Sequence, residues 1–557
     1  MSILRASVWT KIPDNVFISQ LMQDNTSQTP PDKIIYEEAL TGKISTYGSF
    51  HRQIRRTAYQ FREHFQFQPG QTVSISASSC IDYILTAQAV WWAGGVVSPI
   101  NNALHAEEIA RAIDLVKPQF LVVDETLHAK VPNIVKHSMQ CNLGALRVLT
   151  IGTPSVEWPA FPISYSPSID GEPELSCPIS SPGSDPKTTC AAILLSSGTT
   201  GMPKAVMLSH YNLVATCYQL RDDNPQNWRG SQREIFFPPL SHVYALYVCF
   251  TMCTWLGAYV CLMPRFDLEL YCRLLQDRKA TLARIVPPIA KILGDHPVVR
   301  KYQYPCLEYF SCSAAPLHKE TANKLSEAFP GVALCQTYGC TELSGPCVQS
   351  GVRDKDLPLN GAGKLVANSE IRFLDTDGKD VGARGPGEIT CRGPNVMMGY
   401  KDNEEETTKA ILEGGWLRTG DLGYIDKSGY LTVYDRIKDL IKYKGFQVAP
   451  SELENIIIRH PLVREAAVIG VWDDQQATEL PRAFVALKKP AQQNATADVH
   501  KSISNFVADQ VSNYKRLRGG VVIIDALPKN PTGKVMKKEL KDARFSQGVT
   551  GHLTSKL

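Results

Sequence analysis

The stretch from Leu194 to His210 constrains the fold of this chain more than any other part of the sequence. An apolar, β-favouring run over residues 191–195 leads into it, and β-branched and apolar residues follow Lys204. Between them lies a cluster of small hydroxyl residues and glycines: Ser196, Ser197, Gly198, Thr199, Thr200 and Gly201. Glycines let a backbone approach an anion, and successive N–H groups in such a turn form an anion-binding concavity. With the positive charge of Lys204, the stretch predicts a strand–loop–strand unit that binds a triphosphate.

Two other interpretations of this loop are weaker. The spacing G-x-x-x-x-G-K-[ST] of a Walker loop is absent, and strand-like flanks disfavour a flexible Ser/Gly linker. The loop instead resembles S-S-G-T-T-G-x-P-K-G of the adenylate-forming superfamily, which includes acyl- and aryl-CoA ligases, firefly-type luciferases and peptide-synthetase adenylation domains. This chain departs from that pattern at Ala205, where the last glycine usually stands. The resemblance implies that the chain uses ATP, Mg²⁺ and, as a co-substrate, CoA.

A second motif runs from Gln336 to Glu342, Q-T-Y-G-C-T-E, and resembles the family pattern Q-x-Y-G-x-T-E. The resemblance implies that Tyr338 stacks on adenine, that Thr341 bonds the α-phosphate and that Glu342 holds Mg²⁺. A hard carboxylate oxygen suits a hard cation. Gln336, Thr337 and Gly339 would complete the nucleotide site, with Thr337 where the family often has glycine. Taken alone, the motif could also be a glycine turn after a strand.

Two segments are expected to form the acid pocket. Residues 311–317, S-C-S-A-A-P-L, resemble the family's S-G-A-A-P-L, which implies that Ala315 lies against the nucleotide and that Cys312 and Ser313 line the pocket. Ser313 replaces the usual glycine. His242 and Tyr244, in P-P-L-S-H-V-Y-A-L-Y, match the family segment beside the substrate carboxylate. A lone histidine in an apolar stretch is otherwise most often a core residue.

The remaining site residues come from the resemblance alone. In W-L-R-T-G-D, Asp421 would accept the ribose hydroxyls, as suits a carboxylate, and Arg436 would support the ribose and phosphate. Two lysines are assigned to the two half-reactions: Lys534 in N-P-T-G-K to adenylation and Lys442 to thioester formation. Arg265, Lys444 and Gly445 are expected to bind CoA. Lys438 is expected to form the hinge beside the nucleotide.

The order of the predicted elements indicates an α/β fold with more than one domain. At 557 residues the chain exceeds one ordinary core. Strand–helix alternation from residue 72 predicts a parallel sheet with helices on both faces. Residues 153–189 are expected to be a surface connection, and 370–434 a small β-rich subdomain. The prediction is a large domain over 1–434, a hinge at 435–438 and a mobile α+β domain over 439–557.

Composition excludes several classes of protein. A formal net charge of +4 is too small to indicate nucleic-acid binding, and the 15 cysteines lack the paired spacing of a zinc site. Residues 244–264 carry no charge and are long enough to span a membrane, but polar residues and a glycine favour a buried helix and strand over a membrane span.

The chain carries a targeting signal at its C-terminus. Ser555-Lys556-Leu557 predicts recognition by the peroxisomal import receptor.

Taken together, the sequence predicts a peroxisomal, ATP-dependent acid–CoA ligase that acts on a small carboxylic acid. The pattern looks most like 4-coumarate-CoA-ligase-like enzymes, with a place in secondary metabolism. Three alternatives stay open: a luciferase-type oxygenase, an adenylation enzyme that loads a carrier protein, and a catalytically silent AMP-binding fold.

Overall fold

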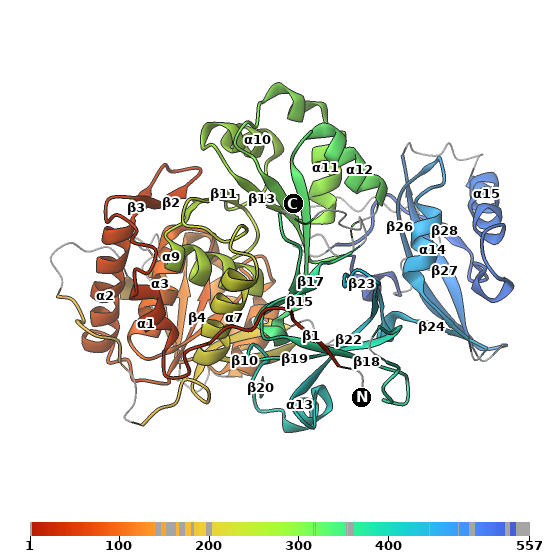
Figure 1. Ribbon diagram of the computed structural model, residues 1–557. Coiled ribbons are helices and arrows are strands. Elements are labelled where there is room, and N and C mark those ends of the chain that lie inside the picture. Colours follow the sequence, from red (N-terminus) through yellow and green to blue (C-terminus); the bar gives the residue numbers. More distant parts are fainter. Residues whose placement is uncertain are drawn as a thin grey trace. The chain divides into compact units, whose positions relative to one another are not determined.

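The computed structural model describes most of the chain and divides it into two compact units. The described residues are 3–139, 146–151, 163–165, 173–179, 183–196, 203–315, 317, 319–352, 354, 361–382, 384–444, 446–476, 478–488, 496–529 and 535–541. The first unit comprises Met1–Arg372, Thr390–Thr419 and Lys427–Leu431, and the second Phe373–Ile389, Gly420–Asp426 and Thr432–Leu557. Elements are labelled in Figure 1.

An eight-stranded sheet in the first unit carries the strands on either side of the predicted phosphate loop. Its order is β20-β10-β9-β5-β4-β6-β7-β8. The strands are β4 (Thr72–Ser76), β5 (Val96–Pro99), β6 (Phe120–Val123), β7 (Arg147–Ile151), β8 (Ile163–Tyr165), β9 (Cys190–Ser196), β10 (Lys204–Ser209) and β20 (Gly399–Tyr400). The strands from β9 through β8 pair in parallel, whereas β10 pairs antiparallel with β9 and β20. Strands β4, β5 and β6 are buried throughout, as expected of a parallel sheet.

A nine-stranded sheet forms the other large layer of the first unit, in the order β17-β16-β15-β14-β13-β11-β12-β2-β3. The strands are β2 (Ile34–Glu38), β3 (Ile44–Thr46), β11 (Arg233–Phe236), β12 (Tyr259–Leu262), β13 (Leu282–Ile285), β14 (Tyr309–Cys312), β15 (Ala333–Cys340), β16 (Gly345–Gln349) and β17 (Lys364–Leu365). The strands from β2 through β15 pair in parallel. Their carboxyl ends therefore meet at one edge of the sheet, which we call the carboxyl edge.

The two faces of the nine-stranded sheet have different coverings. One face packs on a core cluster shared with α10 (Leu268–Asp277), α11 (Pro287–Asp295) and α12 (Lys319–Ala328). On the other face the π-helix η2 (Leu246–Cys253) lies between α8 (Val243–Ala245) and α9 (Thr254–Leu256). Cys253 of η2 donates its thiol proton to Glu234 of β11 at 3.3 Å, so this face holds polar groups as well as aromatic rings.

The first unit contains further helices and helical turns. They are α1 (Ile18–Gln23), α2 (Tyr47–Glu63), α3 (Ile81–Trp92), α4 (Ala106–Val116), α5 (Val131–His137), α7 (His210–Asp223), α13 (Glu404–Ala410) and the 3₁₀ turns η1 (Glu125–Lys130), η3 (Pro297–Lys301) and η4 (Thr341–Leu343). Thr46 caps α2 and Ser209 caps α7, each by accepting a backbone N–H of the first turn. Helices α2 and α3 lie side by side.

A six-stranded sheet follows in the order β1-β18-β19-β22-β21, with β23 beside β22. These strands are β1 (Leu4–Arg5), β18 (Glu370–Leu374), β19 (Gly387–Arg392), β21 (Ile411–Leu412), β22 (Trp416–Ile425) and β23 (Leu431–Arg436). The elements that come after them are η5 (Ile437–Asp439), β24 (Ile441–Tyr443), β25 (Phe446–Val448), α14 (Pro450–Ile457), β26 (Val463–Asp473), β27 (Thr478–Leu487), α15 (Thr496–Ala508), η7 (Asn513–Lys515), β28 (Val521–Ile523) and α16 (Lys537–Leu540). Strands β26, β27 and β28 form one sheet, and α14 and α15 pack with it around an apolar cluster.

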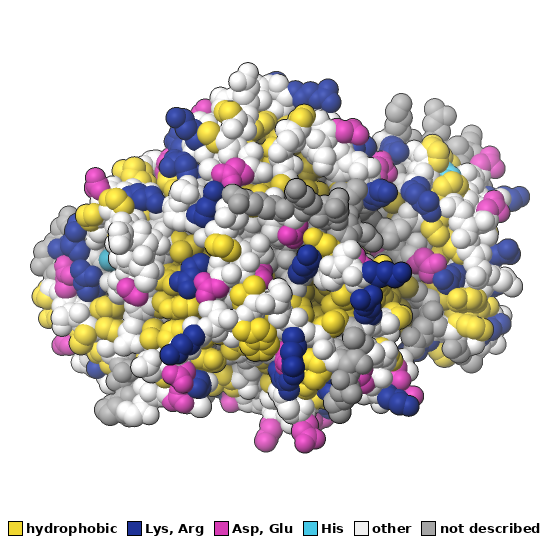
Figure 2. All heavy atoms as spheres, in the orientation of Figure 1, with side chains coloured by type: hydrophobic (Ala, Val, Ile, Leu, Met, Phe, Trp, Pro, Cys, Tyr) yellow, Lys and Arg dark blue, Asp and Glu magenta, His cyan; other side chains and the backbone are white. Residues whose placement is uncertain are grey.

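The α/β class and most predicted elements agree with the structure. Residues 244–264 form buried helical turns and a strand, and none of the described helices is long and apolar enough to cross a bilayer. One expectation was wrong: the connection over 153–189 contains the short strand β8, which extends the parallel sheet beyond β7. The buried helix and strand expected over 244–264 are confirmed, with residues 246–253 in π-helical geometry, which apolar periodicity does not distinguish from an α-helix. On the face in Figure 2, charged side chains of both signs are interspersed.

Candidate active site

Residues from four of the predicted motifs follow parallel strands at the carboxyl edge of the nine-stranded sheet. His242 comes after β11, Arg265 after β12, Ser313 after β14, and Gln336 stands where β15 leaves its parallel partner. Because carboxyl ends of parallel strands meet at one edge, these segments are brought together from distant parts of the chain. Arg265 is exposed and Gln336 is buried.

The Q-T-Y-G-C-T-E segment turns away from the parallel sheet. Residues Thr337–Cys340 pair antiparallel with β16, and the register shifts between Tyr338 and Gly339. A Cβ at Gly339 would lie 2.1 Å from the carbonyl oxygen of Gly345, so no larger residue fits without separating the strands. The turn η4 then places Thr341 and Glu342 beside β9 and β10.

The predicted phosphate loop lies between β9 and β10. Residues 197–202, which include Ser197, Gly198, Thr199, Thr200 and Gly201, lie outside the described residues. The hydroxyl of Ser196, at the end of β9, is buried, and no described residue forms a hydrogen bond with it. An orphaned buried hydroxyl at the mouth of this loop is what a phosphate oxygen would satisfy.

Lys204, on the other side of the loop, is held by two groups. Its ammonium lies 2.5 Å from Glu406 of α13 and 4.7 Å from the centre of the Tyr400 ring. The Tyr400 hydroxyl donates to Glu342 at 3.2 Å. Burial, together with the Glu342 carboxylate, holds the pKa of Tyr400 well above its usual value, so the hydroxyl keeps its proton. Tyr400 thus links the predicted phosphate lysine to the predicted magnesium carboxylate.

Glu342 fits the magnesium role by its chemistry. It is a partly exposed carboxylate that is fixed through one oxygen by the Tyr400 hydroxyl. Within the described residues no group of three or more His, Cys, Asp or Glu side chains could hold a metal by itself. One carboxylate is enough for Mg²⁺ when substrate phosphates supply the other ligands.

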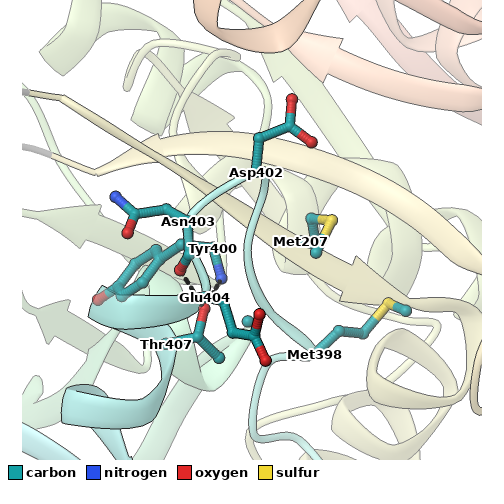
Figure 3. A pocket seen from close by; sticks show the side chains of 8 residues that line it. Met207, Met398, Tyr400, Asp402, Asn403, Glu404 and Thr407 are labelled. Atoms are coloured by element: carbon teal, nitrogen blue, oxygen red, sulfur yellow. Dashed lines mark hydrogen bonds between the residues drawn. The ribbon is translucent and has the colours of Figure 1, made fainter.

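A pocket of about 420 Å³, lined in part by Tyr400, lies between β10 and α13 (Figure 3). Asn403 and Thr407 also line it: Thr407 donates its hydroxyl proton to the Asn403 carbonyl and accepts the Tyr400 N–H. Asn403 also caps α13. These bonds fix the helix that carries Glu406, and through it the position of Lys204.

The residues predicted to line the acid pocket have different settings in the structure. His242 caps α8, with its Nδ1 accepting the Tyr244 backbone N–H at 3.2 Å. Tyr244 is buried, and Ser313 is half-buried. Cys312 belongs instead to the core cluster against α10, α11 and α12, because neighbouring residues of a strand face opposite sides of the sheet. The expectation that Cys312 lines the pocket was therefore wrong.

Within the second unit, the structure pairs two predicted nucleotide residues. Arg436 of β23 donates from Nε to Asp421 of β22 at 3.0 Å, and the Asp421 side chain is 8% exposed. A buried carboxylate held by a guanidinium is preorganised to accept hydroxyl donors.

The predicted lysines of the second unit differ in setting. Lys438 lies in η5, between β23 and β24. Lys442 is exposed on β24, and its backbone N–H is fixed by Glu479 at 2.8 Å. Lys444 is exposed at φ +47° and its backbone N–H donates to Thr478. Lys534 and Gly445 lie outside the described residues.

Sequence reasoning missed Tyr400 and Glu406. The run Glu404–Glu406 after Asn403 has the pattern of a helix N-terminus, which would have found α13. No sequence signal pairs Glu406 with a lysine about 200 positions earlier. The missed partners therefore depend on tertiary structure rather than on any motif.

Comparison with known proteins agrees with this arrangement. Residues 22–401 match the model of the AMP-binding enzyme family, and residues 452–534 match that of the AMP-binding enzyme C-terminal domain. The first match alone spans more than half of the chain, so this chain belongs to the AMP-binding enzyme family.

Relatives named as CoA ligases cover nearly the whole chain. A probable 4-coumarate–CoA ligase of Dictyostelium discoideum is 31% identical over 92% of this chain and 93% of its own length. The peroxisomal OPC-8:0-CoA ligase of Arabidopsis thaliana is 32% identical, over 92% and 91%. Among solved structures, ATP-bound MatB from Rhodopseudomonas palustris superposes with a TM-score of 0.82 at 26% identity, covering 95% of this chain and 98% of MatB.

Proposed function

We propose that this enzyme activates a carboxylic acid with ATP, forming an acyl-adenylate and pyrophosphate, and then transfers the acyl group to CoA with release of AMP. The observation that carries the proposal is the gathering of the acid-pocket and nucleotide motifs at one edge of a parallel sheet. Membership of the AMP-binding enzyme family and the names of the relatives support the same reaction.

The first half-reaction gives a carboxylate a good leaving group. A carboxylate oxygen attacks the α-phosphorus of ATP, and the bond to the bridging oxygen of pyrophosphate breaks. Thr341 would bond the α-phosphate, Lys534 would offset charge that develops there, and His242 would border the carboxylate. Mg²⁺ held by Glu342 supplies charge neutralisation for the phosphates. Ser196 and Lys204 contact the remaining phosphate oxygens in this proposal.

The second half-reaction uses other groups. The CoA thiolate attacks the acyl carbon, and AMP leaves with the electron pair of the cleaved bond. Lys442 would act here, with Lys444, Gly445 and Arg265 binding CoA. One domain would end at residue 434 and the other begin at 439. The hinge at 435–438 would let the C-terminal domain rotate, so that different residues face the active site in the two steps. Excluding water keeps the adenylate from hydrolysis.

We also propose that the enzyme acts in the peroxisome, in secondary metabolism. Ser555-Lys556-Leu557 is a receptor-read peroxisomal address, and one relative is named as a peroxisomal ligase. The address lies in the part of the chain outside the described residues.

The test is AMP release across a panel of aryl and fatty acids, with and without CoA, for wild type, Lys534→Ala and Lys442→Ala. We expect steady AMP release only with both acid and CoA. Lys534→Ala should lose adenylate formation, whereas Lys442→Ala should form adenylate but transfer it slowly. Light emission with luciferin would show that the enzyme is a luciferase-type oxygenase. Loading of a carrier protein in place of CoA would show that it is a carrier-protein-loading adenylation enzyme. ATP binding without turnover of any acid would indicate a silent AMP-binding fold.

A further inference from the structure

Two buried cysteines are in contact inside the first unit. Cys347 lies on β16 and Cys391 on β19, strands of two different sheets, and both residues belong to the first unit. Their Sγ atoms are 3.7 Å apart, and each residue is 1% exposed. The fold thus holds together two thiols that are 44 positions apart in the sequence.

The hydrogen bonds of the two thiols give the contact a direction. Cys347 donates its thiol proton to the Tyr338 carbonyl at 3.8 Å, so Cys391 is the donor in the contact between the two sulfur atoms. Thiols are weak donors, and these bonds therefore contribute little to stability. What distinguishes this contact from one between two apolar side chains is that its two sulfur atoms can be joined covalently.

Cys347 stands at the register shift opposite the predicted adenine segment. Across the antiparallel pair of β15 and β16, Tyr338 faces Val348 and Gly339 faces Pro346. Cys347 is therefore the extra residue opposite the peptide bond between Tyr338 and Gly339, where the ladder of hydrogen bonds is interrupted. A movement of Cys347 acts directly on the residue that is predicted to stack on adenine.

The packing around this register shift is tight. A Cβ at Gly339 would lie 2.1 Å from the Gly345 carbonyl oxygen, and a Cβ at Gly345 would lie 2.9 Å from the Tyr247 ring. Interiors packed this closely transmit a displacement rather than absorb it. Sulfur atoms in a disulfide are about 2.0 Å apart, so joining Cys347 to Cys391 closes part of the present gap. It also removes the proton that Cys347 donates to Tyr338.

We propose that a hydroperoxide oxidises Cys347 and Cys391 to a disulfide, and that this disulfide weakens the binding of ATP. With hydrogen peroxide, one thiolate attacks a peroxide oxygen and the O–O bond breaks, which leaves a sulfenic acid and a hydroxide that takes up the thiol proton. The second thiol attacks the sulfenic sulfur, the S–O bond breaks and water leaves. In total the two thiols lose two electrons and two protons, and the peroxide becomes two water molecules.

Burial determines how the pair reacts. A buried thiol is slow to react, and the exposed Cys177 is oxidised sooner. Hydrogen peroxide, which is only slightly larger than water, reaches the pair when the strands open locally at the register shift. Once one sulfur is oxidised, the other is already in contact with it, so the disulfide forms before further peroxide adds oxygen. A thiol reductant reverses the reaction by exchange.

The test uses the full chain before peroxide treatment, after it, and after later reduction with dithiothreitol. Mass spectrometry of unreduced peptides detects the link between Cys347 and Cys391, and calorimetry measures the dissociation constant of ATP. Cys391→Ala removes the sulfur that lies away from the adenine segment, and Cys391→Ser replaces it if the alanine variant does not fold. Cys335→Ala is the matched control, because it removes a buried thiol of β15 and leaves the pair intact.

We expect the linked peptide in wild type and in Cys335→Ala, with a dissociation constant for ATP that rises about 10-fold on oxidation and returns with dithiothreitol. Cys391→Ala should bind ATP equally before and after peroxide. The inference is overturned if peroxide oxidises Cys177 but links no pair, if the link forms and ATP binding stays the same, or if Cys391→Ala loses as much affinity as wild type. Both readouts are taken without acid or CoA, so failure of the proposed ligase function would leave the inference standing.

Discussion

At the scale of single residues, neighbouring side chains hold the predicted phosphate and magnesium residues in place. Lys204 touches both Glu406 and the Tyr400 ring, and Tyr400 bonds Glu342. These contacts fix a lysine at the phosphate loop before any nucleotide arrives. A preorganised charge of this kind contributes to binding without a reorganisation cost.

Replacing Lys204 by methionine tests that role. We expect kcat/KM for ATP to fall about 10–100-fold, because a charge-assisted contact to phosphate is worth about 1.5–3 kcal/mol. Lys409→Met is the control, since Lys409 also pairs with Glu406 but on the exposed surface of α13. Steady-state kinetics over ATP concentration measures both. Equal effects of the two substitutions would contradict the assignment of Lys204.

The free energy of unfolding is expected to depend on pH through the buried carboxyl group of Asp223. Burial raises its pKa from 3.8 to about 6, against hydrogen bonds from Gln349 and Asn224. Folding therefore favours the protonated form, so this group's contribution to stability is present below pH 3.8 and is lost as pH rises through about 6. Asp223→Asn should raise the free energy of unfolding by about 3 kcal/mol at pH 8 and by about 1 kcal/mol at pH 4.5. Urea denaturation at the two pH values measures this, and a gain that does not depend on pH would contradict the stated cause.

At the scale of elements, parallel strands bring distant segments to one edge, and tight strand contacts shape the segment there. Gly339 is such a contact, since its Cα hydrogen faces the Gly345 carbonyl. Gly339→Ala should separate β15 from β16 and displace Tyr338. We expect a loss of ATP-dependent activity of at least about 100-fold, corresponding to about 3 kcal/mol.

Gly331→Ala is the control for this change, because its Cβ would enter open space and meet only the strain of φ +82°. That strain costs about 1–2 kcal/mol of stability. Activity measured beside a thermal unfolding curve separates the two effects. If Gly339→Ala keeps full activity, Tyr338 does not depend on the β15–β16 contact.

Much of the element order could be predicted from local pattern. The helix over Ala106–Val116 and the strand over Phe120–Val123 follow directly from apolar periodicity and length. The π-helix η2 could not be predicted, because its uniform apolar run fits several helical geometries. Cys312 was misplaced for a related reason: which face of a strand meets the pocket is set by neighbouring strands, not by the motif.

Of the candidate site, the motif residues at the carboxyl edge could be anticipated, but their supporting partners could not. Tyr400 donates a hydrogen bond to Glu342, and Glu406 pairs with Lys204, each across a long stretch of sequence. The buried pair of Arg284 and Glu234 gives no local signal either, since a charged residue in an apolar strand is usually an edge or a surface position.

At the scale of the whole molecule, the chain has two compact units and assigned residues in each. Lys204 and Glu342 belong to the first, and Asp421 and Lys442 to the second. The proposed reaction needs both, since the predicted phosphate and magnesium residues belong to the first unit and the lysine predicted for thioester formation belongs to the second.

The C-terminal tripeptide is expected to determine where the whole protein lies in the cell. Removal of Ser555-Lys556-Leu557 should abolish peroxisomal import and leave ligase activity in vitro unchanged. Fluorescence microscopy of the full chain and of the shortened chain, each with an N-terminal fluorescent tag, measures the first part. Peroxisomal import of the shortened chain would contradict the proposed address.

Formation of an acyl-adenylate by this enzyme is tested most directly by acid-dependent exchange of labelled pyrophosphate into ATP in the absence of CoA. We expect exchange with wild type and with Lys442→Ala, none with Lys534→Ala, and a mass-spectrometric signal for the acyl-adenylate that CoA converts to the thioester in wild type. Thioester formation without any exchange or adenylate, or exchange that Lys534→Ala leaves intact, would contradict it.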